Sequence, residues 1–179
     1  MNENLKIQEA EYFLSQMCEN NERPFFNYNL SAFLTAARSV LQYAFEESKT
    51  KPNGKSWYDP AIQNRPVVKF FKDKRDINIH ASEPVNPSAD INIGINDTIS
   101  LSDEVFITVT DKDGNIKDEI KVPRSQPTKE IESNEPVVNY RFIFRDWSGN
   151  EDVVDLSRQY VKELKEIISD GVARDFITG

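Results

Sequence analysis

The chain has 179 residues, of which 38% are hydrophobic and 11% aromatic, and its formal net charge is −8. This length allows a hydrophobic core that needs no disulfide or metal, and the apolar fraction is too high for a disordered chain. The acidic balance argues against general affinity for nucleic acids, because that affinity comes from lysines and arginines that neutralise phosphates.

Three further features limit the class of protein. The single cysteine, Cys18, excludes an intramolecular disulfide and a zinc site made of several cysteines, which favours a reducing compartment. The first residues contain no basic segment followed by an apolar run, so no signal peptide is predicted. The longest apolar stretch, residues 30–45, is interrupted by Arg38 and is shorter than the roughly 20 residues that span a bilayer. We therefore expect a cytoplasmic protein without a membrane segment.

Two helices are predicted near the start of the chain. Apolar residues between positions 10 and 17 recur at helical spacing and predict an amphipathic helix over residues 3–20. The stretch 30–45 is apolar around most of its circumference and predicts the central helix of a bundle. Arg38 lies on the apolar side of that helix, so its guanidinium requires an internal partner, and we expect a salt bridge.

A third helix is predicted after a connector that spans residues 49–58. Two dipeptides that follow the connector are typical of helix starts with proline in the first turn: Asp59-Pro60 and Arg65-Pro66. We expect the third main helix over residues 66–79. The segment 81–88 contains two prolines and ends it.

Beyond this helix the apolar period changes from helical to alternating. Four segments alternate and are predicted strands: 91–95, 105–109, 116–122 and 138–144. The linker 111–115 predicts a hairpin between the second and third strands. Its Asp111-x-Asp113 start resembles a calcium loop, but the glycine stands at the fourth position instead of the sixth, and no metal site is predicted. Residues 123–136 are polar and are predicted to form a loop.

The end of the chain returns to helical spacing. Apolar residues from 153 to 168 form one face of a helix, and Gly171 is the predicted stop. The predicted fold class is α+β. A helical bundle, residues 1–82, is followed by a small antiparallel sheet and a C-terminal helix, residues 89–179, and this second part can pack on the bundle as one unit.

The segment from Arg65 to His80 carries five basic and two acidic residues in an otherwise acidic chain. Such a segment can bind a polyanion. It can equally be the solvated face of a helix, which is the usual role of a charge run. The lysines that would reach phosphates in the first case are Lys69, Lys72 and Lys74.

His80 is the single histidine of the chain, so its surroundings are the candidate for chemistry. In helical projection Arg75 and Asn78 fall on the apolar arc of the third helix, where polar side chains are costly unless they are partnered. These two residues therefore indicate either a functional site or a structural network. His80 falls on another face. It meets Arg75 only if the helix loosens after Ile77, if the long arginine reaches around, or if a second subunit supplies one of the pair.

The segment Arg75-Asp-Ile-Asn-Ile-His80 resembles the R-x4-6-H motif of the HEPN superfamily, including a polar residue directly after the arginine. The preceding segment FFNYNLSAFLTAARSVLQYAF is similar to a HEPN core helix, and the resemblance covers roughly residues 5–82. It implies a small helical bundle that forms a homodimer with two motifs in one cleft. It also implies binding of RNA or a nucleotide, and metal-independent endoribonuclease activity, which many members have, without a cofactor.

The resemblance also implies roles for the residues of the motif. Arg75 would bind the scissile phosphate, and His80 would shuttle the proton as general base or acid. Asp76 and Asn78 would orient these two side chains. Three lysines would contact the RNA backbone: Lys69, Lys72 and Lys74.

An alternative interpretation makes the same residues architectural. Arg75 would pair with Glu9 or Glu11 of the first helix, and His80 would cap the end of its own helix. The chain would then be a noncatalytic module for protein interaction or dimerisation, with its sheet or C-terminal helix binding a protein partner. The acidic net charge favours this interpretation, whereas the arginine–histidine pair on a basic segment favours the ribonuclease.

Overall fold

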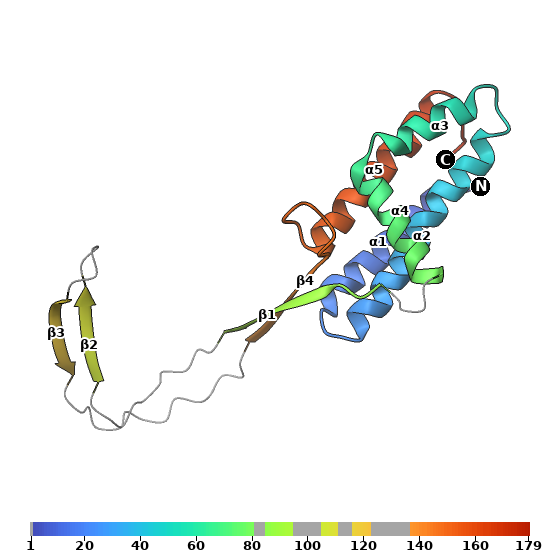
Figure 1. Ribbon diagram of the computed structural model, residues 1–179. Helices are drawn as coiled ribbons and strands as arrows, with labels where there is room; N and C mark the ends of the chain where they lie inside the picture. Colours follow the sequence, from blue (N-terminus) through green and yellow to red (C-terminus); the bar gives the residue numbers. More distant parts are fainter. Residues whose placement is uncertain (1, 81–84, 95–104, 111–115, 123–136) are drawn as a thin grey trace. The chain divides into compact units, whose positions relative to one another are not determined.

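The computed structural model describes residues 2–80, 85–94, 105–110, 116–122 and 137–179, and for residues 79, 80, 91–94, 105–110, 117, 119–122 and 137–139 it describes the backbone alone. The chain divides into two compact units, one formed by Met1–Asn92 with Tyr140–Gly179 and the other by Ile93–Asn139. The first is a helical unit, and the second is an insertion that contains a β-hairpin (Figure 1).

The described part of the helical unit contains five helices: α1 (Glu3–Glu19), α2 (Phe25–Ser48), α3 (Gly54–Gln63), α4 (Pro66–His80) and α5 (Val153–Ala173). Two of them begin with a side-chain cap. The Asn2 side chain accepts a hydrogen bond from the Leu5 N–H at 3.0 Å, and the Asp152 side chain accepts one from the Asp155 N–H at 2.8 Å. Such caps satisfy amide groups that the first turn of a helix leaves unpaired. None of the described helices is long and apolar enough to cross a membrane.

The central helix α2 carries the hydrophobic core. It is buried along most of its length, from Phe26 to Ala44, and the other four helices pack around it. The ring of Phe33 in α2 meets the rings of Phe71 in α4 and Tyr160 in α5, with centroids 5.9 and 6.2 Å away. The rings of Phe71 and Tyr160 stack on each other at 4.7 Å. These aromatic contacts join three helices at the centre of the unit.

Arg38 lies beside two tyrosines instead of a carboxylate. Its Nε and Nη1 are buried without a hydrogen-bond partner among the described residues, so the expected salt bridge is not found in that part of the chain. The hydroxyl of Tyr58 donates to the carbonyl oxygen of Leu41 at 2.9 Å. Burial raises the pKa of Tyr58 to about 12, although the adjacent Arg38 guanidinium opposes this shift. Burial likewise raises the pKa of Tyr160, so both phenols stay protonated at neutral pH.

Helix α3 is the element that the sequence patterns miss. A helix start at Asp59-Pro60 is wrong, because α3 begins at Gly54 and Pro60 lies inside it. A proline at this place removes one backbone hydrogen bond, and the burial of Trp57 and Tyr58 offsets that loss. Gly54 is required at the start of the helix, since a Cβ there would lie 1.9 Å from a carbonyl oxygen at the end of α2.

Three other predicted helices and the four predicted strands are confirmed. The helices expected over 3–20, 30–45 and 66–79 correspond to α1, α2 and α4. The four expected strands are present: β1 (Ser88–Gly94), β2 (Val105–Thr110), β3 (Ile116–Val122) and β4 (Val137–Ile143). In the described residues they form two ladders, in which β1 pairs with β4 and β2 pairs antiparallel with β3. The predicted loops at 111–115 and 123–136 lie outside the described residues.

The C-terminal helix belongs to the helical unit. Helix α5 packs on α1, α2 and α4. The predicted division of the chain, into residues 1–82 and 89–179, places this helix with the strands, whereas the structure places it in the helical unit. Its apolar face is buried in the helical unit, which explains the grouping. The fold is therefore a helix-rich α+β structure in which segments from both ends of the chain build one core.

Gly171 is not the stop of α5, which continues to Ala173. The glycine allows a close approach instead, because a Cβ at this position would lie 2.6 Å from Cζ2 and Cη2 of Trp57. The chain turns at Asp175, whose φ is +60°, and the Phe176 N–H then donates to the Gly171 carbonyl oxygen at 2.9 Å. A residue other than glycine thus takes the left-handed position at the end of the helix.

The contact between Gly171 and Trp57 leads to a prediction about stability. Gly171→Ala should lower the free energy of unfolding by about 1–3 kcal/mol, since the added methyl group overlaps the buried indole and outweighs the better helix propensity of alanine. Urea denaturation of the two proteins measures the difference. Ser169→Ala, at an exposed position of the same helix, is the control and should leave stability nearly unchanged. An equal or higher stability of Gly171→Ala would contradict this account.

Candidate functional site

The candidate site lies on the last turns of α4. The backbone of α4 is helical through His80, so the helix does not loosen after Ile77. Positions 75 and 80 are then separated by about 140° around the helix axis. Two of the three arrangements that could join Arg75 and His80 are left: an arginine that reaches around the helix, or a second subunit. The side chain of His80 lies outside the described part.

Among the described residues, Arg75 pairs with one neighbour, Asp76. Its Nη1 donates to Oδ1 of Asp76 at 3.3 Å, and its side chain keeps 29% of its surface exposed. Its Nε is buried and has no hydrogen-bond partner among the described residues. The acidic partners proposed for an architectural role are bound elsewhere, because Glu9 pairs with a lysine of its own helix and Glu11 pairs with Lys165. Part of the Arg75 side chain therefore stays exposed and forms no ion pair with another helix in the described part of the chain.

Asn78 joins the end of α4 by hydrogen bonds to α2 and to the segment that follows α4. Its Nδ2 donates to Oγ of Ser31 in α2 at 2.8 Å, and its Oδ1 accepts from the Val85 N–H at 3.2 Å. Both polar groups of the amide are therefore satisfied inside the protein. Asn78 can affect the candidate site by fixing the helix end, two residues before His80, between α2 and the segment that follows α4.

Lys74 is also engaged inside the protein. Its Nζ donates to both carboxylate oxygens of Asp146 at 2.7 and 2.6 Å, and only 12% of its side chain is exposed. The same Nζ lies 5.1 and 5.0 Å from the ring centroids of Phe70 and Phe144. These contacts attach the segment after β4 to α4. Two further lysines of α4 are exposed or half-buried and form no ion pair with the described residues: Lys69 and Lys72.

The sequence indicates part of this arrangement. The position of Asn78 on the apolar arc of a helix predicts a functional site or a network, and the amide lies in a network. Its partners Ser31 and Val85 could not be found from the sequence, because neither carries a pattern that points to α4. Asp146 was likewise missed, since an acidic residue in a turn after a strand is common.

The two hydrogen bonds of Asn78 lead to a second prediction. Asn78→Ala should lower the free energy of unfolding by about 1–2 kcal/mol, because two partly buried hydrogen bonds are lost. Ser31→Ala removes one of the same bonds, so the two changes should be non-additive by about 0.5–1 kcal/mol in a double-mutant cycle. Chemical denaturation of the four proteins measures this coupling. Full additivity would show that the two side chains do not interact.

Comparison with known proteins gives no further constraint on this site. No family model, no curated protein and no solved structure matches the chain.

Proposed function

We propose that the chain is a HEPN-type protein that cleaves RNA without a metal, with Arg75 and His80 as its catalytic residues. The observation that carries this proposal is the guanidinium of Arg75. It is partly exposed, and among the described residues it pairs only with the adjacent Asp76. Arg75 stands five positions before the single histidine of the chain. The helix end that carries both residues is held in place by Asn78. An arginine that served only to hold the bundle together would be expected to pair with another helix.

The proposed reaction is a transesterification. The 2′-hydroxyl of RNA attacks the adjacent phosphorus, the bond from phosphorus to the 5′-oxygen breaks, and a 2′,3′-cyclic phosphate and a 5′-hydroxyl are formed. His80 takes the proton of the 2′-hydroxyl and returns it to the leaving 5′-oxygen. Arg75 binds the nonbridging oxygens, on which negative charge builds up in the transition state.

The geometry of α4 favours a site shared by two copies of the chain. A separation of about 140° on a continuous helix directs the two positions away from each other. In a symmetric dimer, Arg75 of one protomer can lie opposite His80 of the other, and the two-fold axis generates two such pairs. A homodimer is therefore part of the proposal.

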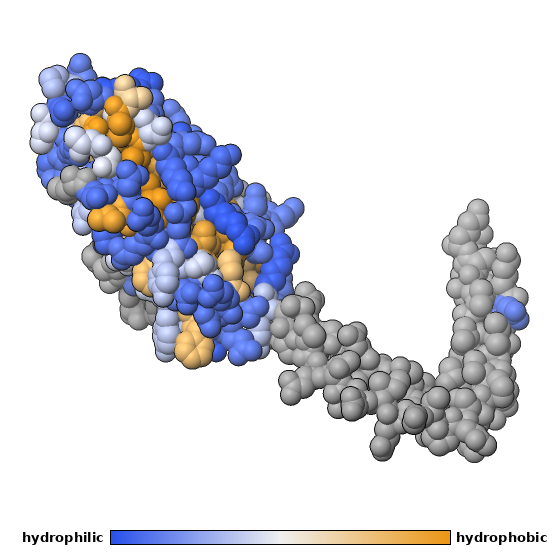
Figure 2. Space-filling view, turned by 180° about the vertical axis from the view of Figure 1, so that it is seen from behind, coloured by the Kyte–Doolittle hydropathy of each residue, from blue (hydrophilic) through white to orange (hydrophobic). Residues whose placement is uncertain are grey.

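A noncatalytic interaction module is the second candidate. It is favoured by exposed apolar side chains close to the same helix end. Tyr28 is 65% exposed one turn before Ser31, and Ile77, beside Asn78, is 45% exposed. Seen from behind relative to Figure 1, the surface of the helical unit also shows hydrophobic residues among hydrophilic ones (Figure 2). In this case the surface around α4 would bind protein, and Lys74 and Asn78 would have structural roles alone.

An RNA cleavage assay separates the two candidates. Purified protein should cleave labelled single-stranded RNA in the presence of EDTA and leave 2′,3′-cyclic phosphate ends. Arg75→Ala and His80→Ala should each lower the rate by about 100-fold or more, since each removes a group that acts in the transition state. Arg158→Ala, which removes an exposed arginine of α5, is the matched control and should cleave like the wild type. Equal background cleavage by all four proteins would support the interaction module.

Mixing the two inactive variants tests the shared site. A dimer of one Arg75→Ala chain and one His80→Ala chain contains one intact pair across its interface, so an equimolar mixture should recover about one quarter of the wild-type activity. Cleavage that stays absent after the subunits have exchanged would instead place both residues of a site in one chain.

A further inference from the structure

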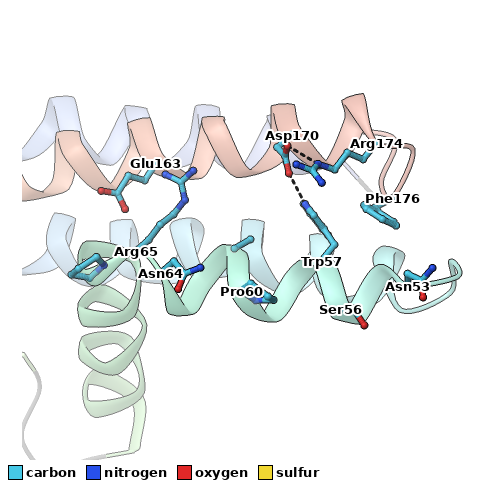
Figure 3. Close-up of a pocket in the computed structure, with 12 residues that line it drawn as sticks. Asn53, Ser56, Trp57, Pro60, Asn64, Arg65, Glu163, Asp170, Arg174 and Phe176 are labelled. Carbon is cyan, nitrogen blue, oxygen red and sulfur yellow. Dashed lines mark hydrogen bonds and ion pairs between the residues drawn. The ribbon is translucent and has the colours of Figure 1, made fainter.

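A groove of about 720 Å³ lies between α3 and α5, and both arginines that line it are paired. Figure 3 shows Nε of Arg174 directed at Asp170, to whose Oδ1 it donates at 2.8 Å. Beyond the groove carboxylate of Glu163, Nη1 of Arg65 donates to Oε2 of Glu166 at 2.8 Å. An anionic ligand in this groove would have to compete with two carboxylates for the guanidinium groups.

A second pocket, of about 340 Å³, lies where β4 ends and the chain turns toward α5. Residues alternate between the two sides of a strand, so Phe142 and Phe144 are buried while Arg141 lies exposed on the other side. Arg145 is exposed in the turn that follows and lines the same pocket. We call it the arginine pocket, after Arg141 and Arg145.

The loop that closes the arginine pocket is fixed by its own contacts. Nε1 of Trp147 donates to Oε2 of Glu151 at 2.9 Å, and this bond is the main cause of the lowered pKa of Glu151. A Cβ at Gly149 would lie 1.9 Å from the same oxygen, so the loop needs glycine there. Nη2 of Arg141 donates to the carbonyl oxygen of Asn150 at 2.6 Å. The guanidinium of Arg141 is therefore held at the pocket before any ligand binds.

The charges of the arginine pocket are not balanced. Arg145 has no hydrogen bond or ion pair with the described residues, and the one partner of Arg141 among them is an uncharged carbonyl oxygen. Against these two cations the lining carries one carboxylate, that of Glu151. The pocket therefore has a surplus of one positive charge in a chain whose net charge is −8. A ligand with one negative charge and oxygen acceptors would balance it.

The arginine pocket is attached to the helix that carries the candidate site. Nζ of Lys74 in α4 binds both carboxylate oxygens of Asp146 at 2.7 and 2.6 Å. Lys74 directly precedes Arg75, and Asp146 directly follows Arg145. The ion pair therefore keeps the backbone at Arg145 beside the backbone at Arg75, and it also removes the charge of Asp146 from the surroundings of the pocket.

We infer that the arginine pocket binds one nucleotide of single-stranded RNA, with the phosphodiester group on Arg141 and Arg145. The inference rests on the proposed function for the identity of the ligand. A phosphodiester carries the single negative charge that the pocket lacks, and its two nonbridging oxygens suit two guanidinium groups. Two apolar side chains of the lining, Ile143 and Trp147, face the base or the sugar. Cations beside an aromatic ring are the combination by which proteins hold single strands.

Binding of RNA to the cleavage-inactive His80→Ala chain tests the inference. Fluorescence anisotropy of labelled octauridylate measures the affinity. Arg145→Gln, added to this chain, should weaken binding by about tenfold, since a charge-assisted contact is lost. Arg174→Gln is the matched control, because it makes the same change of net charge at an exposed arginine of the α3–α5 groove, and it should leave the affinity unchanged. Arg145 forms no bond with the described residues, so Arg145→Gln should keep the melting temperature of its parent chain.

Cleavage kinetics separate this inference from the proposed function. In the otherwise wild-type chain, Arg145→Gln should raise KM and leave kcat unchanged, because Arg145 positions the strand and does not act on the reacting phosphate. RNA binding that needs Arg145 in a chain that cleaves nothing would contradict the proposed function and support the arginine pocket. Cleavage with the same KM in Arg145→Gln and the wild type would overturn the inference alone.

Three binding results would also overturn it. They are absence of RNA binding by the His80→Ala chain, equal weakening by Arg145→Gln and Arg174→Gln, and displacement of the labelled RNA by octaglutamate as effective as by unlabelled RNA. The last result would show that the arginine pocket takes an acidic polypeptide as well as a phosphodiester.

Discussion

The packing of Phe33 against Phe71 and Tyr160 is the interaction on which the rest of the helical unit depends. It brings α2, α4 and α5 to one point in the core, and all three rings are almost completely buried. The ends of α4 and α5 are positioned from there. Beyond Phe71 the axis of α4 leads to Arg75, and beyond Tyr160 the next turn of α5 leads to Glu163. A change that loosened these rings would therefore disturb the candidate site and the groove together.

Polar contacts refine positions that the apolar core sets. Asn78 fixes the end of α4, Lys74 attaches the segment after β4, and the bond from Trp57 to Asp170 spans the groove between α3 and α5. Each of these contacts joins elements that are far apart in the sequence. Single hydrogen bonds contribute little net free energy, but they select one arrangement of helices whose apolar faces would tolerate several.

Elements with a clear apolar period could be predicted, and those governed by distant contacts could not. The helices α1, α2, α4 and α5 and all four strands follow their hydrophobic patterns. Helix α3 does not, because its proline and short length hide a helix that is held by Trp57 and Tyr58. Arg38 was recognised as a buried cation, but its tyrosine neighbours come from helices that the sequence could not place beside it. For the candidate site, the helical projection identifies Arg75 and Asn78 as polar residues on an apolar face. The hydrogen bond from Asn78 to Ser31 could be found only from the fold.

The discontinuous construction of the helical unit has a consequence for synthesis on the ribosome. Residues 1–92 are made first, but the helix that covers Phe33 and Phe71 comes from the segment that begins at Tyr140. Helices α1 to α4 thus emerge from the ribosome with an apolar surface that stays exposed while the whole inserted unit is translated. During that interval the nascent chain exposes hydrophobic surface of the kind that promotes aggregation, and the emergence of α5 covers it.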